Sequence, residues 1–439
     1  GIVETMRLLP SWAVVLVPGL GGLLAGLVLH FGKRVLPGQS STDYMEAILI
    51  GSGRIPIRAS MVKCAAALFS IGSGGSIGRE GPMVQLAAVV SSWVGRWRKF
   101  TAPQQRLLVA CGAASGIASA YNAPIGGSFF VAEIILGSIA MESLGPLVVS
   151  AVAATLTIRS LTNVAQLYQV PPYRMNSLWE MGLFVALGLI VGTVSPWFLR
   201  SLRRSEKFFV GLPLPLIARL GLGGLGVGVA AVYIPEVCGN GYTVVVSILR
   251  GEFVWTTLVL IFVCKWLATA LSFGSGAPGG VFTPSLFMGA CCGFLFGTAV
   301  HAFWPAGGAD PRAFAMVGMG AFLAAVSHAP VMAIIMMFEM TLSYDIILPL
   351  MLCSVVAYFT AKSIEGDSLY SEALKKKAAA APPTEVKPAT CQVDQLMRPN
   401  PPTLTRQANF AEIGRMFLAN RLNNLYVIDE QTKFLGVVS

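Results

Sequence analysis

The sequence predicts an all-α polytopic membrane protein made of two homologous halves arranged as an inverted repeat, followed by a partial α/β module. Three observations lead to this fold class: long uncharged runs, an internal repeat of two glycine-rich segments, and a change in composition after residue 361. The chain has 439 residues, of which 55% are hydrophobic and 12% are charged. A soluble domain has about one quarter charged residues, so the composition favours a membrane protein.

The uncharged runs are long enough to cross a bilayer. Residues 8–32, 107–132, 266–309 and 313–338 contain no Asp, Glu, Lys or Arg. An apolar run of about 20 residues spans the membrane as a helix, whereas the strands of a membrane barrel alternate in polarity over roughly ten residues. The sequence therefore excludes a soluble enzyme and predicts a helical transmembrane domain over residues 9–361, in contact with membrane lipid.

The net charge of +10 does not indicate a nucleic-acid partner. Basic residues form no stripe that alternates with aromatic residues; they cluster at Arg96–Arg106 and at Arg200–Lys207. Short basic loops tend to stay on the cytoplasmic side of the membrane. We therefore expect these clusters in cytoplasmic loops and expect no nucleic acid among the partners.

Changes in polarity divide the chain further. A more polar connector from Ser160 to Asn176 separates halves of about 9–160 and 177–361. Residues 362–392 are predicted to be a cytoplasmic segment and a flexible linker, because Lys375–Lys377 is followed by an Ala/Pro run. Residues 393–439 have the composition of a soluble α/β module.

Three elements are predicted in the C-terminal module. Ala408–Asn420 has the apolar spacing of a helix, and Leu425–Ile428 and Phe434–Val438 have the composition of short strands. The sequence stops where the second strand is complete, so we expect a partial module.

The internal repeat is the decisive feature. Lys63–Pro82 and Lys265–Pro284 align without a gap and are identical at eight of 20 positions, including Gly78/Gly280. A second matched pair follows, since Asn122-Ala123-Pro124 corresponds to His328-Ala329-Pro330 and a glutamate, Glu133 or Glu339, stands nine residues after each proline. Paired Gly/Pro-interrupted segments in two halves of a transporter indicate a binding site near the bilayer midplane.

Each repeat is predicted to contain a membrane helix that is broken at the midplane. Glycine permits non-helical backbone, and proline suits the first turn of a helix. New helices should therefore begin near Glu80–Pro82 and near Phe282–Pro284. Helix starts present unpaired N–H groups that bind anions, although small residues could instead serve close helix packing.

Glu80 is the principal candidate residue. An ionised carboxylate inside a membrane is costly unless it is functional or paired. When ionised, Glu80 can occupy the same positive pocket as a free halide; when protonated, it loses that attraction and leaves. Binding of a proton and of an anion would then be linked. The structural alternative is a salt bridge to the neighbouring Arg79.

These motifs resemble those of the CLC chloride channel/transporter family. Gly78-Arg79-Glu80-Gly81-Pro82 is similar to the gating-glutamate motif, and Gly276–Pro284 is similar to the second anion-binding motif. The resemblance implies that Glu80 gates the pathway and handles protons. It also implies that an anion is bound by the residues of these motifs and by a tyrosine further along the chain: Gly78, Arg79, Gly81, Gly280, Val281, Phe282 and Tyr370.

The resemblance has further implications. It implies a homodimer with one pore in each subunit, and a C-terminal module similar to the first part of a CBS domain, which in relatives can bind adenine nucleotides. No other cofactor and no metal are expected, and chloride is the transported ligand. The location implied is the plasma membrane (the inner membrane of a bacterium), with the C-terminal module in the cytoplasm.

The sequence departs from the family pattern at the inner end of the anion site. The family has a serine there, and Ser52 in Gly51-Ser52-Gly53 imitates its motif but stands too close to Glu80 in the sequence. Gln39 or Ser40, at the start of the helix predicted over Thr42–Ile50, fits the spacing better. Ser40 could equally be a helix N-cap.

A second departure concerns protons. Family exchangers often have an inner glutamate directly after the position of Glu133, but here that residue is Ile134. An isoleucine cannot relay protons. We expect Glu133 and Glu339 to be buried, hydrogen-bonded structural residues.

The sequence therefore predicts chloride transport past Glu80, with proton-coupled exchange first, a passive chloride channel second and a fluoride-selective transporter third. An intramembrane enzyme would need an Asp pair, a His–metal cluster or a Ser/His set at membrane depth, and the chain shows none of these patterns. A cation transporter would need carboxylates and carbonyls at its site, whereas the paired features here are helix starts.

Overall fold

A computed structural model describes most of the chain. The described residues are 2–35, 44–49, 51–137, 140–162, 168, 179–304, 310–380, 403–420, 425–429, 431 and 433–438. They divide into two compact units, Gly1–Lys377 and Ala378–Ser439. Each unit is considered by itself.

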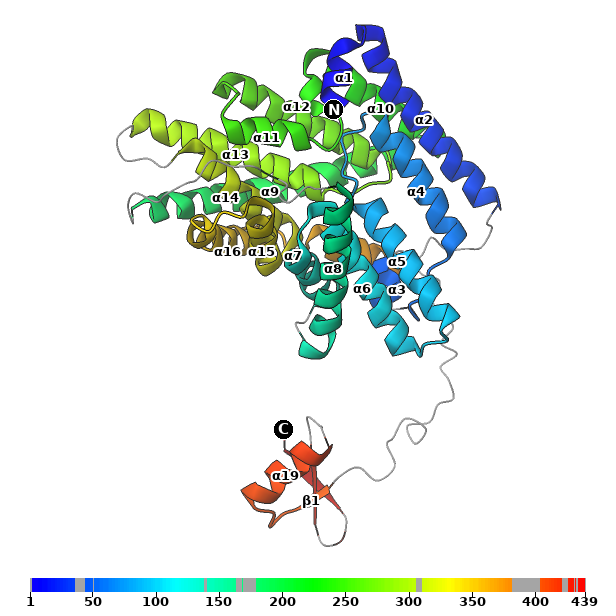
Figure 1. The fold of residues 1–439 in the computed structure, drawn as a ribbon, viewed down its shortest axis with the longest axis vertical. Coiled ribbons are helices and arrows are strands. Elements are labelled where there is room, and N and C mark those ends of the chain that lie inside the picture. Colours follow the sequence, from blue (N-terminus) through cyan, green and yellow to red (C-terminus); the bar gives the residue numbers. More distant parts are fainter. Residues whose placement is uncertain are drawn as a thin grey trace. The chain divides into compact units, whose positions relative to one another are not determined.

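The regular elements of the first unit are all helices in its described part (Figure 1). Its first half contains α1 (Ile2–Leu8), α2 (Ser11–Val35), α3 (Tyr44–Leu49), α4 (Ile57–Gly72), α5 (Glu80–Trp97), α6 (Ala102–Tyr121), α7 (Pro124–Phe129), the π-helical turn η1 (Phe130–Ile135) and α8 (Met141–Thr162). Its second half contains α9 (Glu180–Gly211), α10 (Leu216–Tyr233), the 3-10 turn η2 (Pro235–Val237), α11 (Tyr242–Arg250), α12 (Trp255–Gly274), α13 (Phe282–Phe303), α14 (Pro311–Ser327), α15 (Pro330–Thr341) and α16 (Ile347–Ile364). The last helix, α17 (Leu369–Ala380), follows the second half.

Seven of the described helices are long and apolar enough to cross a membrane: α2, α8, α9, α10, α12, α13 and α16. Three shorter apolar stretches accompany them, at Pro124–Ile135, Pro311–Ser327 and Pro330–Thr341. This pattern confirms the prediction of a polytopic helical membrane protein.

The two halves repeat the same order of elements around the predicted breaks. Helix α4 ends at Gly72 and α5 begins at Glu80, while α12 ends at Gly274 and α13 begins at Phe282. Both new helices therefore start within the ranges predicted from the proline positions. The second matched pair also shares its backbone, because Asn122 and His328 both end their helices with φ 55°.

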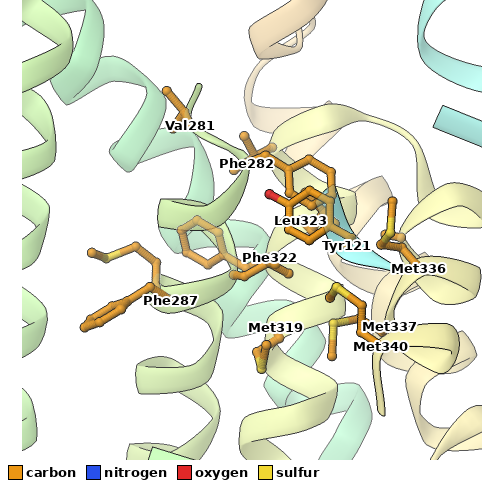
Figure 2. Packing of buried hydrophobic residues seen from close by; sticks show 14 of the residues in the cluster. Tyr121, Val281, Phe282, Phe287, Met319, Phe322, Leu323, Met336, Met337 and Met340 are labelled. Atoms are coloured by element: carbon orange, nitrogen blue, oxygen red, sulfur yellow. The ribbon is translucent and has the colours of Figure 1, made fainter. Parts of the chain in front are cut away.

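Close packing between helices depends on glycine, as is usual in membrane proteins. Helices α13 and α14 meet at Gly289 and Gly318, where an added Cβ would lie 2.3 and 2.4 Å from a carbonyl oxygen of the other helix. Helix α2 lies beside α10 and α4 (Figure 1). Figure 2 shows part of the buried apolar core, where Phe322 of α14, Met336 and Met337 of α15, and Tyr121 of α6 gather near the start of α13.

The C-terminal unit contains a small mixed sheet. Strand β1 (Thr403–Thr405) pairs in parallel with β2 (Leu425–Ile428), which pairs antiparallel with β3 (Phe434–Val438). Helix α19 (Phe410–Asn420) connects β1 to β2. The predicted helix and two strands are confirmed, and β1 is an additional strand that the sequence did not reveal because it is only three residues long.

One linker prediction was wrong. Lys375–Lys377, which we assigned to a flexible linker, belongs to α17. Lysine and alanine are good helix formers, and Lys375 Nζ forms an ion pair with Asp367 Oδ1 at 2.6 Å just before the helix begins. The helix therefore continues beyond the amphipathic stretch at Leu369–Leu374.

Candidate functional site: two broken helices around Glu80

The two glycine-rich segments meet face to face. Gly78 N–H donates to Gly280 O at 2.7 Å, and Gly280 N–H donates to Gly78 O at 2.9 Å. The same position of each repeat thus pairs reciprocally with the other in an antiparallel bridge. Such pairing gives the two segments a local twofold relation, as expected for an inverted repeat.

The turns that lead into this bridge match in detail. Gly74 and Gly276, at equivalent positions, have φ of +105° and +92°, a backbone conformation that glycine adopts without strain. A direct tie between the halves lies beside them, because Ser272 Oγ accepts a hydrogen bond from Ser76 N–H at 3.0 Å. The backbone at each helix break therefore has a defined conformation that is held by hydrogen bonds between the two halves.

The carboxylate of Glu80 reaches from the first helix start to the second. Its Oε1 accepts a hydrogen bond from Thr283 N–H at 3.2 Å, and its Oε2 accepts one from Thr283 Oγ1 at 3.1 Å. Glu80 is only 4% exposed. A buried carboxylate is thus held at the amino-terminal end of α13, where the helix dipole and the unpaired N–H groups favour negative charge.

Glycine makes room for this carboxylate. A Cβ added to Gly78 would lie 2.1 Å from Glu80 Oε2, and a Cβ added to Gly280 would lie 2.5 Å from Glu80 Oε1. Any larger residue at either position would displace the carboxyl group. The two residues that form the bridge therefore also shape the pocket in which the carboxylate lies.

A cavity of about 470 Å³ adjoins the carboxylate. Several predicted site residues line it: Glu80, Gly81, Gly280, Val281 and Tyr370. Lys63 also lines this cavity and adds a cationic side chain that we did not assign to the site. The cavity combines backbone N–H groups, one carboxylate and one lysine, a set of groups that can receive a small anion.

The remaining predicted residues are placed differently. Arg79 is exposed and is the N-cap residue of α5, and Phe282 packs its ring 4.8 Å from that of Tyr121. Ser52 is exposed and is absent from the residues that line the cavity. Gln39 and Ser40 lie outside the described residues.

The loop that contains Ser52 has a packing role. Gly53 O accepts hydrogen bonds from Ser92 Oγ at 2.9 Å and from Gln105 Nε2 at 3.1 Å. The loop after α3 is thereby attached to α5 and α6. This packing role gives the loop a structural purpose, which agrees with our expectation that Ser52 is a false match to the family's serine motif.

Tyr370 is held in the cavity wall by ionic contacts of its own helix and of the preceding residues. Arg203 of α9 forms ion pairs with Glu365 and with Glu372 of α17, each at 2.8 Å. Burial raises the pKa of Glu365, but hydrogen bonds from Arg203 and Arg200 outweigh burial and bring the pKa below 4.5. These contacts fix the first turn of α17, and the Tyr370 ring packs edge-on at 5.7 Å from Phe130.

The family model for voltage-gated chloride channels matches residues 21–362, well over half of the chain. The chain belongs to the CLC family. A CBS-domain model matches residues 393–439. The resemblance drawn from the glycine motifs is therefore confirmed, and the chain is a multi-pass CLC membrane protein rather than an enzyme.

Similar proteins include two bacterial relatives. A protein of Ralstonia nicotianae, described as ClcB-like chloride channel protein, is 50% identical over 86% of this chain and 89% of its own length. The voltage-gated ClC-type chloride channel ClcB of Escherichia coli O9:H4 (strain HS) is 38% identical over 84% of this chain and 89% of its own length.

Solved structures show the same fold. A slow cyanobacterial Cl⁻/H⁺ antiporter has a TM-score of 0.77 and 26% identity, over 87% of this chain and 91% of that structure. A eukaryotic CLC transporter has a TM-score of 0.67 and 22% identity, over 99% of this chain and 80% of that structure. These matches confirm the predicted fold class.

The paired glutamates of this CLC protein each cap a helix of the opposite half. Glu133 accepts hydrogen bonds from Val331 N–H and Met332 N–H at the start of α15. Glu339 accepts them from Ile125 N–H and Gly126 N–H at the start of α7. The predicted hydrogen bonding is confirmed, although both side chains are partly rather than wholly buried.

Besides Lys63, two residues around the Glu80 carboxylate were missed by sequence reasoning. Thr283 binds the Glu80 carboxylate, and Tyr121 lies behind Thr283, with 2.8 Å between their hydroxyl oxygens. A signal for Thr283 was available, because it replaces the glycine that the first repeat has at Gly81. No spacing rule predicted the contact with Tyr121, which is 162 residues away in the sequence.

Metal binding finds no support in the described part of the chain, where no three His, Cys, Asp or Glu side chains come together in a group that could hold an ion.

Proposed function

We propose that this CLC protein transports chloride across the membrane past Glu80 and exchanges it for protons. One observation carries the proposal: the Glu80 carboxylate is bound at the start of α13 by Thr283 N–H, in a pocket suited to a free anion. A tethered carboxylate and a chloride ion compete for such a pocket. Protonation of Glu80 removes its negative charge and frees the pocket for chloride.

The chemistry of the pocket supports an anion rather than a cation. Its donors are backbone N–H groups at the helix start and the Thr283 hydroxyl, and Lys63 faces the same cavity. Cation sites need several carboxylate or carbonyl oxygens. The named chloride channels and the chloride/proton antiporter among the similar proteins agree with this choice.

A passive chloride channel is the second candidate, and Ile134 favours it. Ile134 lies in η1 next to Glu133, whose carboxylate is already bound to two amides of α15. Ile134 has no group that could carry a proton, and both carboxylate oxygens of Glu133 are engaged in capping α15. In an exchanger, protons would therefore have to reach Glu80 through water in the cavity.

The assembly we propose is a homodimer with a pore in each subunit, in the inner membrane of a bacterium. The C-terminal module would be cytoplasmic, because short basic segments stay inside and basic residues gather at Arg96–Arg106, around the turn between α5 and α6, and at Arg200–Lys207. The second cluster lies within α9, not in a loop as we expected. Light scattering of the purified protein in detergent tests the dimer, and protease access in oriented membranes tests the topology.

The deciding experiment measures chloride efflux and proton uptake at the same time in liposomes, with a chloride gradient as the only driving force. We expect coupled movement for the wild type. Glu80→Gln should abolish proton uptake and the pH dependence of chloride flux, because the amide cannot titrate. Glu142→Gln, which changes an exposed carboxylate in α8, is the matched control and should behave as wild type.

Each other outcome identifies another mechanism. Chloride efflux without proton uptake in the wild type would establish the passive channel. A wild-type pH response in Glu80→Gln would remove Glu80 from its assigned role. Parallel measurements with fluoride and sodium gradients test the fluoride-selective and cation alternatives.

A further inference from the structure

A chain of two hydroxyl groups ends on the Glu80 carboxylate. Thr283 Oγ1 lies 3.1 Å from Glu80 Oε2 and 2.8 Å from Tyr121 OH. Thr283 and Tyr121 are 4% and 5% exposed, so water does not replace these contacts. Figure 2 shows Tyr121 beside Phe282 at the start of α13, and their rings are 4.8 Å apart.

The direction in which these hydroxyl groups donate follows from counting their protons. The Thr283 hydroxyl has one proton, and an ionised carboxylate can only accept. Thr283 therefore donates to Glu80, and Tyr121 must donate to Thr283. Donation from a phenol polarises the threonine hydroxyl and strengthens its hydrogen bond to the charged oxygen.

Comparison of the two repeats shows that this pair of hydroxyl groups is present at only one of the two helix starts. The positions equivalent to Thr283 and Tyr121 in the opposite halves are Gly81 and Ser327. Gly81 has no side chain, and Ser327 Oγ donates to Leu323 O of its own helix at 2.6 Å. The hydroxyl pair therefore lies at the helix start that receives the Glu80 carboxylate. The equivalent start of α5 has no such pair, and the residue equivalent to Glu80 is Phe282, which has no carboxylate to be received there.

We infer that Thr283 is a positioning residue that latches the Glu80 carboxylate in the anion pocket, and that Tyr121 holds the Thr283 hydroxyl in the donating orientation. The inference rests on the proposed function, in which Glu80 and chloride compete for this pocket. Each contact that retains the carboxylate raises the chloride concentration needed to replace it. Thr283 thus sets the apparent chloride affinity without being part of the proton pathway.

The test uses full-length protein in liposomes and measures the chloride concentration that gives half-maximal flux. Thr283→Val keeps the shape of the side chain and removes the hydroxyl. We expect the half-saturating chloride concentration to fall about tenfold, the factor that corresponds to losing one hydrogen bond to a charged group. Thr283→Ser keeps the hydroxyl and should therefore have the wild-type half-saturating concentration. Tyr121→Phe should lower that concentration less, about threefold.

Two further variants separate the latch from a general packing effect. Ser327→Ala removes a buried hydroxyl at the position equivalent to Tyr121 and should leave the half-saturating concentration unchanged. In a Glu80→Ala background, Thr283→Val should have no additional effect, because the carboxylate that it latches is gone.

The outcomes distinguish this inference from the proposed function. Suppose that Glu80→Ala changes the chloride dependence of flux, but the half-saturating chloride concentration of Thr283→Val stays within twofold of the wild-type value. The positioning role of Thr283 is then wrong, and the role of Glu80 stands. A tenfold effect of Thr283→Val that persists in the Glu80→Ala background would also overturn the latch, since the hydroxyl would then act on chloride itself. If Glu80→Ala has no effect at all, the proposed gating and the latch both fail.

Discussion

The two broken-helix segments share a backbone and differ in the side chains at their tips. Gly78 and Gly280 bind each other reciprocally. Each is followed two residues later by the first residue of a helix, Glu80 for α5 and Phe282 for α13. In the first segment the tip residue is a carboxylate that leaves its own helix start and binds Thr283 of the other segment. The second segment has no acidic residue at its tip and supplies the amides and the hydroxyl that receive the carboxylate.

The lysines that begin the two repeats diverge in the same way. Lys63 is partly exposed and lines the cavity beside Glu80. Lys265 is fully buried and donates to Val237 O at 2.9 Å and Gly239 O at 2.7 Å. A duplicated backbone thus provides the pocket, while the differences between the copies make one copy the gate and the other the receiver in our proposal.

The largest effect is expected from Gly280→Ala, which tests whether the receiving segment carries the ion. Its Cβ would lie 2.5 Å from Glu80 Oε1, in the space that we assign to chloride, so chloride flux in liposomes should fall at least tenfold, as a misplaced contact in a tight site can cause. Gly81→Ala is the comparison, because the nearest atom to its Cβ would be 3.5 Å away, and its effect should be much smaller. Equal flux in wild type and Gly280→Ala would show that the ion passes elsewhere.

A smaller effect, on stability, is expected at the ends of the two helices before the breaks. A Cβ at Gly274 would lie 2.7 Å from the backbone carbon of Ser205, whereas a Cβ at Gly72 would meet nothing within 4 Å. Gly274→Ala should therefore cost about 1–3 kcal/mol of unfolding free energy through overpacking, and Gly72→Ala should cost almost nothing. Thermal unfolding in detergent measures both, and equal melting temperatures would contradict the asymmetry between the copies.

The smallest effect concerns α17, which follows only the second half. The pKa of Glu365 is below its ordinary 4.5, so its pairing with Arg203 stabilises the docked helix above that pH and is lost as the pH falls through the lowered pKa. Hydrogen exchange of residues 371–375, corrected for intrinsic rates, should show this loss of protection on acidification. At neutral pH, Arg203→Gln should reduce protection about fivefold, since such a pair is worth about 1 kcal/mol. Unchanged protection in the variant would mean that apolar packing alone holds Tyr370.

Much of the fold could be predicted because membrane helices leave strong local signals. Long uncharged runs identified the spanning segments, and proline in the first turn located the starts of α5 and α13. The matching sequences of the repeats indicated that the segments meet. Short elements were less predictable: β1 has three residues, and the continuation of α17 through Lys375–Lys377 depends on helix propensity and on the ion pair with Asp367.

The candidate site was predicted in part. Glu80, Gly280 and Tyr370 come together around the cavity, and their functional roles stay predictions. Arg79 was included because it belongs to the motif, but its side chain is exposed. Sequence motifs identify residues by their spacing along the chain, so they include neighbours that point away and omit distant partners such as Tyr121.

By itself, the sequence determined that this chain spans a membrane, that it is duplicated, and that each copy breaks a helix at a glycine-rich segment, because apolar length, repeated residues and turn chemistry are local properties. Only the tertiary structure decided that the Glu80 carboxylate crosses to Thr283 and that Tyr121 stands behind the threonine hydroxyl. Those contacts join residues 162 and 203 positions apart. Their geometry depends on how closely glycine lets the two backbones approach, which no run of residues specifies alone.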